Sequence, residues 1–294
     1  MYEITPHHEF FVGIDSDGCT FDTMELKHKE CFIPNTINCY GLQAVSKYAR
    51  EAAEFVNLYS KSRGINRFPA LIEVLEWLQK RPEVRNRSVQ VKVPAAVVKW
   101  LAEERQLGDP ALQAKVAATG DPELQQCLEW SEAINATVAK IVRDVPPFPF
   151  VRESLEKLSG QADMVVCSAT PTVALQAEWK EHGIDKYVEA ICGQEVGTKK
   201  DILTNAAKYA VQHSLMIGDA PGDYSAAQAN KCLFFPINPG AEDASWQRFY
   251  EDGIDRFLNG TFVGVYQQEL LVEFANYLPQ RPPWPVVEDD RVTR

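Results

Sequence analysis

The sequence lacks several features that would place the protein in a membrane or outside the cell. No run approaches the roughly 20 apolar residues of a membrane helix. The first residues carry neither a basic start nor a long apolar stretch, so we expect no secretory signal peptide. The seven cysteines are odd in number, and none has the Cys-x-x-Cys spacing of a zinc site. These absences argue against a disulfide scaffold and predict a soluble, cytoplasmic protein with reduced thiols.

Positive charge is also scarce. The 30 Lys and Arg residues against 41 Asp and Glu give a formal net charge of −11. This balance disfavours non-specific nucleic-acid binding, which needs cationic side chains to displace counterions. A small anion remains an acceptable ligand, because a local pocket can be positive on an acidic protein. Hydrophobic residues make up 45% and charged residues 24% of the chain, which is ordinary for a globular protein.

The hydrophobic pattern changes along the chain. Residues 21–147 show apolar residues at helical spacing, and only 88–93 suggests a strand. A proline-rich break at 146–149 ends this block. Short apolar runs then alternate with helical segments as far as 238, which indicates βαβ units of a parallel sheet. The apolar run at 10–14 has the same character as these later strands.

We therefore predict an α/β protein with a doubly wound, parallel-sheet, Rossmann-like core. The core is expected to combine residues 1–20 and 148–238, with residues 21–147 forming an inserted helical cap domain. Residues 239–294 are predicted to form a helical C-terminal extension that ends in an extended or disordered, proline-rich tail.

Polar residues follow the predicted strands of this core where the strands end. Ligands of parallel sheets bind at that edge. The residues expected there are Asp15, Asp17 and Gly18 after the first strand, Ser168 and Ala169 after the second, Lys199 and Lys200 after the third, and Asp219 and Asp223 after the fourth. Clustered carboxylates favour a hard cation such as Mg²⁺. Hydroxyl, ammonium and free backbone N–H groups suit a phosphate, and Gly18 permits a sharp turn that presents such amides.

These residues resemble the four motifs of the haloacid dehalogenase superfamily. The chain has an apolar strand followed by Asp-x-Asp-Gly, a strand ending in Ser168, a lysine that opens a helix, and Gly-Asp-x-x-x-Asp. Their order and spacing match the family, and residues 10–20 and about 150–238 carry the match. The stretch after Gly18 is similar to the helical-cap branch that contains β-phosphoglucomutase. The cap is larger than that branch's usual unit, and the C-terminal helices match nothing in it.

The resemblance implies a role for each motif residue. Asp15 would be the nucleophile that forms an aspartyl phosphate, and Asp17 the acid and base. Phosphoryl oxygens would be held by Gly18, Ser168, Ala169 and a lysine. Mg²⁺ would be bound by Asp15, the backbone carbonyl of Asp17 and Asp219, while Asp223 would either bind the ion or orient a water bound to it.

Structural interpretations remain open for some of these residues. Ser168 could start the next helix, although Thr170 before Pro171 is the better N-cap candidate. Asp223 would also suit an N-cap. Only one of Lys199 and Lys200 needs to reach the site, and Lys199 fits the family spacing better.

Substrate contacts are expected in the cap. The candidates are Thr23 and Lys27 near its start, with Arg63 and Arg67 on a loop between two helices. A guanidinium there could bind a second anionic group, although a solvated turn is the simpler interpretation.

The sequence therefore predicts a Mg²⁺-dependent phosphomonoesterase of a small phosphorylated metabolite. A sugar-phosphate mutase or phosphotransferase is the first alternative. A phosphonate hydrolase, which would use a cap lysine, or a non-catalytic sensor of a phosphorylated ligand is the second. The presence of Asp17 disfavours both dehalogenation and phosphonate hydrolysis.

Overall fold

A computed structural model describes residues 2–287, and the chain divides into two compact units. Unit 1 combines the N-terminal residues up to Met24 with Asp144–Leu278. Unit 2 combines Glu25–Arg143 with the segment that follows Leu278. Among the residues described, no helix is both long and apolar enough to cross a membrane.

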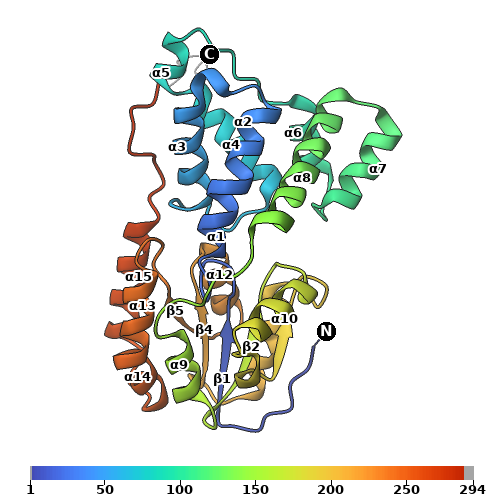
Figure 1. The fold of residues 1–294 in the computed structure, drawn as a ribbon. Helices are drawn as coiled ribbons and strands as arrows, with labels where there is room; N and C mark the ends of the chain where they lie inside the picture. The colour runs from blue at the N-terminus through green and yellow to red at the C-terminus, as the bar shows by residue number, and fades with distance from the viewer. Residues whose placement is uncertain (1, 288–294) are drawn as a thin grey trace. The chain divides into compact units, whose positions relative to one another are not determined.

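Unit 1 is built on a five-stranded parallel sheet with the strand order β3-β2-β1-β4-β5 (Figure 1). The strands are β1 (Phe10–Ile14), β2 (Ala162–Cys167), β3 (Ala190–Cys192), β4 (Ser214–Gly218) and β5 (Leu233–Pro236). In the register of the central strand, Val12 lies opposite Met164 on one side and Leu215 on the other. The α/β architecture predicted from the sequence is confirmed by this topology.

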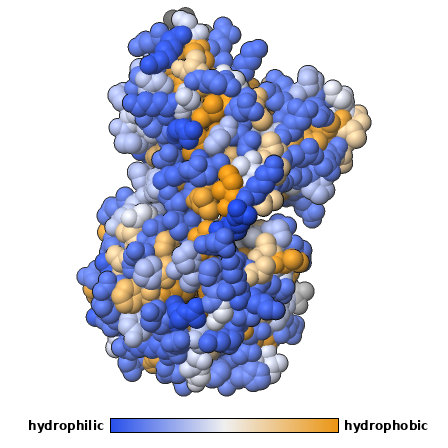
Figure 2. All heavy atoms as spheres, viewed as in Figure 1, coloured by the Kyte–Doolittle hydropathy of each residue, from blue (hydrophilic) through white to orange (hydrophobic). Residues whose placement is uncertain are grey.

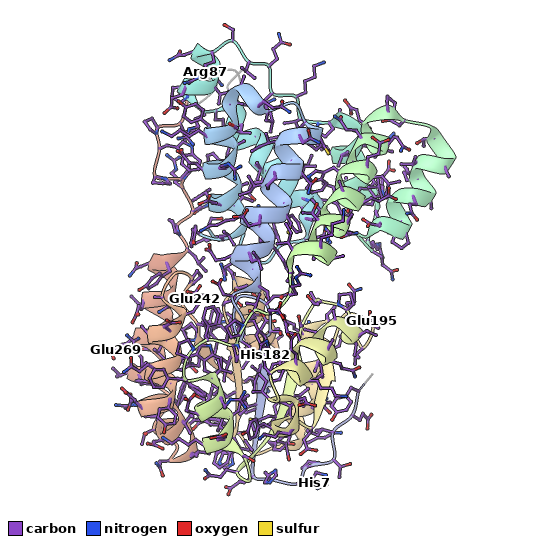
Figure 3. All side chains as sticks on the ribbon, viewed as in Figure 1. His7, Arg87, His182, Glu195, Glu242 and Glu269 are labelled. Atoms are coloured by element: carbon purple, nitrogen blue, oxygen red, sulfur yellow. The ribbon has the colours of Figure 1, made fainter. Side chains whose placement is uncertain are left out.

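Helices cover both faces of the sheet. The helices are α9 (Val151–Leu158), α10 (Thr172–Glu181), α11 (Lys199–Ile202), α12 (Pro221–Ala229), α13 (Glu242–Arg248), α14 (Ile254–Leu258) and α15 (Val265–Tyr277). Shorter helical turns lie at Asp185–Tyr187, Leu203–Lys208 and Phe249–Gly253. Glu269 lies on the outer side of α15 (Figure 3).

Alternation along β1 assigns these helices to the two faces. Val12 and Ile14 belong to an apolar cluster with α9, α10, α13 and α14, whereas Phe11 belongs to a second cluster with α11 and α12. Successive strand residues point to opposite faces, so a strand that is apolar throughout is buried on both. All five residues of β1 are buried in this way.

Unit 2 is a helical unit with its own apolar core. Its elements, the first of which begins at the boundary, are α1 (Thr23–Leu26), a π-helical turn (Lys27–Phe32), α2 (Ile33–Cys39), a 3₁₀ turn (Gln43–Val45), α3 (Ser46–Asn57), α4 (Arg67–Gln79), α5 (Pro82–Asn86), α6 (Ala95–Glu103), α7 (Asp109–Thr119) and α8 (Pro122–Ile141). The segment 88–93 is not a strand; its valines pack into the core of the unit while its backbone stays irregular.

The C-terminal extension, expected as a single region at 239–294, is divided between the two units. Residues 239–278 belong to unit 1, because Trp246, Phe249 and Phe257 pack into the core beside the sheet. The chain then returns to unit 2, where Trp284 stacks on the Arg81 guanidinium at 4.3 Å and contacts Phe55. Hydrophilic residues cover most of the visible surface of each unit (Figure 2).

Candidate active site

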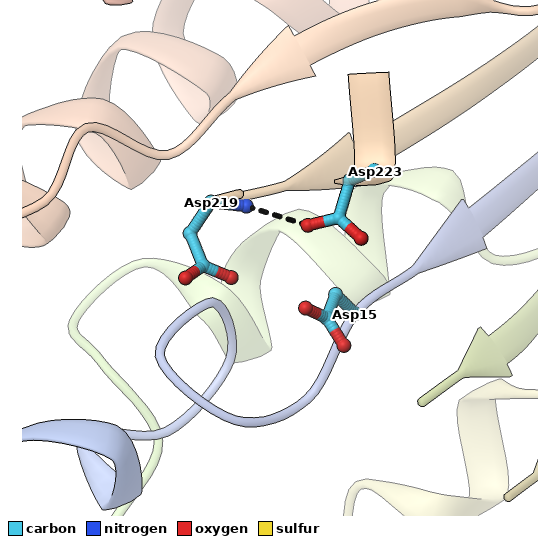
Figure 4. Close-up of side chains that lie close together, drawn as sticks. All are labelled: Asp15, Asp219 and Asp223. Atoms are coloured by element: carbon cyan, nitrogen blue, oxygen red, sulfur yellow. Dashed lines mark hydrogen bonds between the residues drawn. The ribbon is translucent and has the colours of Figure 1, made fainter. Parts of the chain in front are cut away.

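The acidic residues of the site lie at the carboxyl edge of the two central strands. β1 ends at Ile14 and β4 at Gly218, and Ile14 lies opposite Ile217 in the parallel register. Asp15 and Asp219 follow these strands directly, and the Asp15 amide donates to the Ile217 carbonyl at 3.0 Å. Figure 4 shows the resulting group of Asp15, Asp219 and Asp223.

Asp223 reaches this group from the first turn of α12. Its Oδ2 accepts hydrogen bonds from the amides of Asp219 (3.2 Å) and Ala220 (3.0 Å), so it also satisfies backbone donors at the start of the helix. A Cβ at Gly218 would lie 2.5 Å from the Asp223 Cβ. The glycine of this motif is therefore needed for the close approach of Asp223.

Lys199 bridges two of these carboxylates. Its Nζ lies 2.6 Å from Asp15 Oδ2 and 2.5 Å from Asp223 Oδ1. Thr198 caps the helix with its side chain and so directs the following lysine into the site. Lys200, the alternative left open by the sequence, is exposed.

Burial and like charges shift the protonation of these groups. Burial, together with the neighbouring Asp223 and Asp219, raises the pKa of Asp15 well above its usual range, and Lys199 offsets part of this rise. Burial alone would lower the pKa of Lys199, but the carboxylates of Asp15, Asp223 and Asp219 raise it well above its usual value. The lysine is therefore a fixed cation, and the site still carries more negative than positive groups.

Asp17 is held by two hydroxyl groups on either side of its carboxylate. Thr170 Oγ1 donates to Asp17 Oδ2 at 2.5 Å, and Thr23 Oγ1 donates to Asp17 Oδ1. Thr23, expected to contact substrate from the cap, is instead fully buried in unit 1 beside Asp17. Thr170 does not cap α10 as the sequence suggested, because Pro171 occupies the N-cap position. Sequence reasoning missed both of these contacts: Thr23 lies only six positions after Asp17, whereas Thr170 reaches it from 153 positions away.

Ser168 and Ala169 follow β2 at the same edge of the sheet. Ser168 is buried, and its Oγ accepts from the Thr170 amide at 3.2 Å, whereas Ala169 is exposed. Farther along this segment, Thr172 donates through its amide and hydroxyl to Glu195, which lies on the loop after β3 (Figure 3).

Gly18 turns the chain after Asp17 at a positive φ of 76°. Its amide donates to the Phe21 carbonyl at 2.8 Å, so this N–H closes the loop and does not face the site as expected. Cys19 is fully buried, and burial raises the pKa of its thiol well above the usual value. The thiol is therefore neutral and packs in the core.

The remaining cap candidates belong to unit 2, where two of them make structural contacts. Arg63 is buried and donates to the Leu58 carbonyl at 2.8 Å. Arg67 donates to Ser131 Oγ at 3.0 Å and Asn135 Oδ1 at 2.8 Å. Lys27 is half-buried at the start of the π-helical turn. These contacts tie both arginines to the helical scaffold.

The donor set of the site fits a hard divalent cation. One carboxylate oxygen each from Asp15, Asp219 and Asp223 lies within 4.8 Å of the others, and all three residues are buried. Magnesium prefers oxygen ligands and is bound by few carboxylates. A cation among these oxygens would also balance the negative charge that Lys199 leaves uncompensated.

Comparisons with known proteins found no matching family model and no matching curated protein. Similar solved structures include a haloacid dehalogenase (HAD)-superfamily hydrolase from Geobacter sulfurreducens (15% identity, TM-score 0.39, covering 78% of this chain and 88% of that one). A haloacid dehalogenase-like family protein from Streptococcus pneumoniae shares 15% identity at a TM-score of 0.47, over 83% of this chain and 91% of that one. A predicted phosphoglycolate phosphatase from Haemophilus somnus shares 17% identity at a TM-score of 0.39, over 79% and 86% of the two chains. Similarity at this level does not assign a function.

Proposed function

We propose that the protein is a Mg²⁺-dependent phosphomonoesterase of the haloacid dehalogenase type, acting on a small phosphorylated metabolite. The observation that carries this proposal is the buried group at the carboxyl edge of β1 and β4. There Lys199 Nζ lies 2.6 Å from Asp15 and 2.5 Å from Asp223, with Asp219 beside them. A cationic side chain among carboxylates suits a dianionic phosphate together with a metal ion.

Asp15 is the nucleophile in this proposal. The Ser16 amide donates to Asp15 Oδ1 at 2.8 Å, and Lys199 contacts Oδ2, so the carboxylate is fixed in one orientation. One carboxylate oxygen of Asp15 attacks phosphorus, and the bond from phosphorus to the ester oxygen breaks. Fixing the nucleophile in advance removes much of the entropic cost of this step.

Asp17 moves the protons. It gives its proton to the departing ester oxygen, and then accepts a proton from the water that attacks the aspartyl phosphate. The hydroxyls of Thr23 and Thr170 hold its carboxylate in place for this exchange. Hydrolysis releases inorganic phosphate and restores Asp15 as a carboxylate.

Lys199 and Ser168 are proposed to hold the phosphoryl oxygens. Both groups are fixed before a substrate arrives, Lys199 by two carboxylates and Ser168 by its place at the end of β2. When bound by Asp15, Asp219 and Asp223, Mg²⁺ would supply positive charge that stabilises the phosphoryl oxygens.

The test is phosphate release from a panel of phosphorylated metabolites, with Mg²⁺ and with excess chelator. We expect Mg²⁺-dependent release by the wild type and its loss in Asp15→Asn. Asp243→Asn, which changes an exposed carboxylate on α13, serves as the matched control and should retain activity. Release that persists in Asp15→Asn would contradict the assignment. Conversion of a sugar phosphate without release would instead favour phosphoryl transfer between hydroxyls.

A further inference from the structure

The loop that follows Asp15 is tightly closed on itself. The Ser16 carbonyl accepts hydrogen bonds from the amides of Thr20 (2.8 Å) and Phe21 (3.1 Å). Thr20 Oγ1 in turn donates to the Asp15 carbonyl at 2.7 Å. A shift anywhere in this loop therefore reaches Asp15 through a short chain of hydrogen bonds.

One carbonyl of the loop points into the core. Cys19 is fully buried, and a buried carbonyl needs a donor to offset its loss of water. Its donor is Trp246 Nε1, at 2.7 Å, from α13 in the C-terminal extension. The two residues are 227 positions apart, so the contact joins the first motif to a region outside all four motifs.

The donor is itself rigidly held. Trp246 is fully buried and packs edge-on against Phe249, whose ring lies tilted against that of Phe235 of β5 with ring centroids 4.8 Å apart. The neighbouring Ser245 Oγ accepts from the Asn238 amide at 3.0 Å, which fixes the start of α13 to the end of β5. The position of Trp246 is therefore set by an edge of the sheet.

A second indole holds the other end of the loop. Trp179 Nε1 of α10 donates to Ser16 Oγ at 3.0 Å, and the Trp179 ring lies edge-on to Phe21. The loop therefore accepts one hydrogen bond from α10, at Ser16, and one from α13, at Cys19. Both hydrogen bonds are buried from water, which strengthens them and makes their loss costly.

We propose that Trp246 is a positioning residue for the nucleophile, and that α13 of the C-terminal extension supports the active site by holding the Asp15 loop. This proposal rests on the phosphatase function proposed above. Removing the indole N–H leaves the Cys19 carbonyl buried without this donor, so the loop must shift to find another. A shift of about 1 Å in a catalytic group can lower turnover by roughly 100-fold.

The test compares two buried tryptophans that each donate one hydrogen bond. Trp246→Phe removes the donor to the loop. Trp130→Phe removes the donor to Thr36 Oγ1 (2.9 Å) in unit 2 and is the matched control. β-(3-Benzothienyl)alanine at position 246 provides a second variant that keeps the shape of tryptophan and removes only the N–H. This variant decides the question if Trp246→Phe does not fold.

Two readouts separate positioning from general stability. Hydrogen exchange at the amides of Thr20 and Phe21 reports the loop directly, without any substrate. Steady-state kinetics with p-nitrophenyl phosphate reports its consequence. For the Trp246 variants we expect about tenfold or greater loss of loop protection and a kcat lowered by roughly 10- to 100-fold, with KM changed by less than about threefold. Trp130→Phe should change neither loop protection nor kcat.

Other results would overturn the proposal. These are a folded Trp246 variant with unchanged loop protection, and a loosened loop with unchanged kcat. A loss of thermal stability alone, equal in the variants of Trp246 and Trp130, would show a purely structural role. If the wild type hydrolyses no phosphoester at all, the proposed function fails. The exchange data would still show whether Trp246 holds the loop.

Discussion

Replacing Lys199 by Met should destabilise unit 1 and make its stability depend more strongly on Mg²⁺ than that of the wild type. The substitution keeps the length of the side chain and removes the ammonium group, which lies 2.6 Å from Asp15 and 2.5 Å from Asp223. The two carboxylates are only 4% and 1% exposed, so they would lose their cation without gaining water. A buried charge that loses its partner is strongly destabilising.

The expected size of the effect follows from this burial. Removing one partner of a fully buried pair costs about 3–5 kcal/mol. Because the Lys199 side chain is 21% exposed, we expect the lower end of that range, about 3 kcal/mol. The raised pKa of Asp15 adds a pH dependence, since protonated Asp15 no longer needs a cation. The loss should therefore grow as the pH rises through the pKa of Asp15.

Hydrogen exchange of the β1 and β4 amides in the absence of Mg²⁺ would measure this loss, because both strands belong to unit 1. Lys200→Met is the matched control, since Lys200 is exposed and should change stability by less than about 0.5 kcal/mol. Saturating Mg²⁺ should restore much of the stability of Lys199→Met. Equal effects of the two substitutions, or no loss at position 199, would refute the reasoning.

Three further predictions concern hydroxyl, carboxylate and aromatic contacts. Thr170→Val should lower kcat by about tenfold, because it removes the hydroxyl that holds Asp17, and steady-state kinetics would measure this. Asp163→Asn should cost about 2 kcal/mol at pH 7, measured by urea unfolding, because its buried carboxylate accepts several hydrogen bonds. Although burial alone would raise the pKa of Asp163, these hydrogen bonds lower it, so their stabilisation is present above pH about 4 and is lost as the pH falls further. Trp284→Ala should destabilise unit 2 by about 1–2 kcal/mol in hydrogen exchange, because it removes the stacking on Arg81.

Each of these predictions has an outcome that opposes it. Thr172→Val is the control for Thr170→Val. It removes a hydroxyl two positions farther along the chain, which donates to Glu195 and not to Asp17. Equal kcat values in the two variants would reject a role for Thr170. If Asp163→Asn lowers the free energy of unfolding equally at pH 7 and at pH 3, the proposed link between the lowered pKa of Asp163 and stability is contradicted. Unchanged exchange in unit 2 would show that Trp284 does not stabilise it.

The sheet and its acidic edge were predictable because their signals are local. Each strand is a short apolar run, and the parallel βαβ pattern brings the ends of such runs to one edge. Asp15 and Asp219 therefore meet through topology alone. The family spacing favoured Lys199 over Lys200, and in the structure Lys199 is the residue that reaches Asp15 and Asp223.

Two contacts that hold the site, those of Thr170 and Trp246, were not predictable, because they join segments far apart in the sequence. Nothing near Thr170 indicates that its hydroxyl reaches Asp17, since a threonine before proline looks like a helix cap. The sequence around Trp246 predicts an aromatic residue on the apolar face of a helix. It does not predict that the indole N–H donates to the Cys19 carbonyl. The return of the chain to unit 2 was also not predicted from the sequence, because a proline-rich segment with a single tryptophan resembles an exposed tail.

Trapping the covalent intermediate tests the central claim most directly. The wild-type protein would be mixed with Mg²⁺ and a phosphoester that it hydrolyses, reduced with borohydride, digested and examined by mass spectrometry. Borohydride reduces an aspartyl phosphate to homoserine, and we predict this change at Asp15 only, and only when substrate is present. Turnover accompanied by modification at another residue, or by none under conditions that trap acyl phosphates, would contradict Asp15 as the nucleophile.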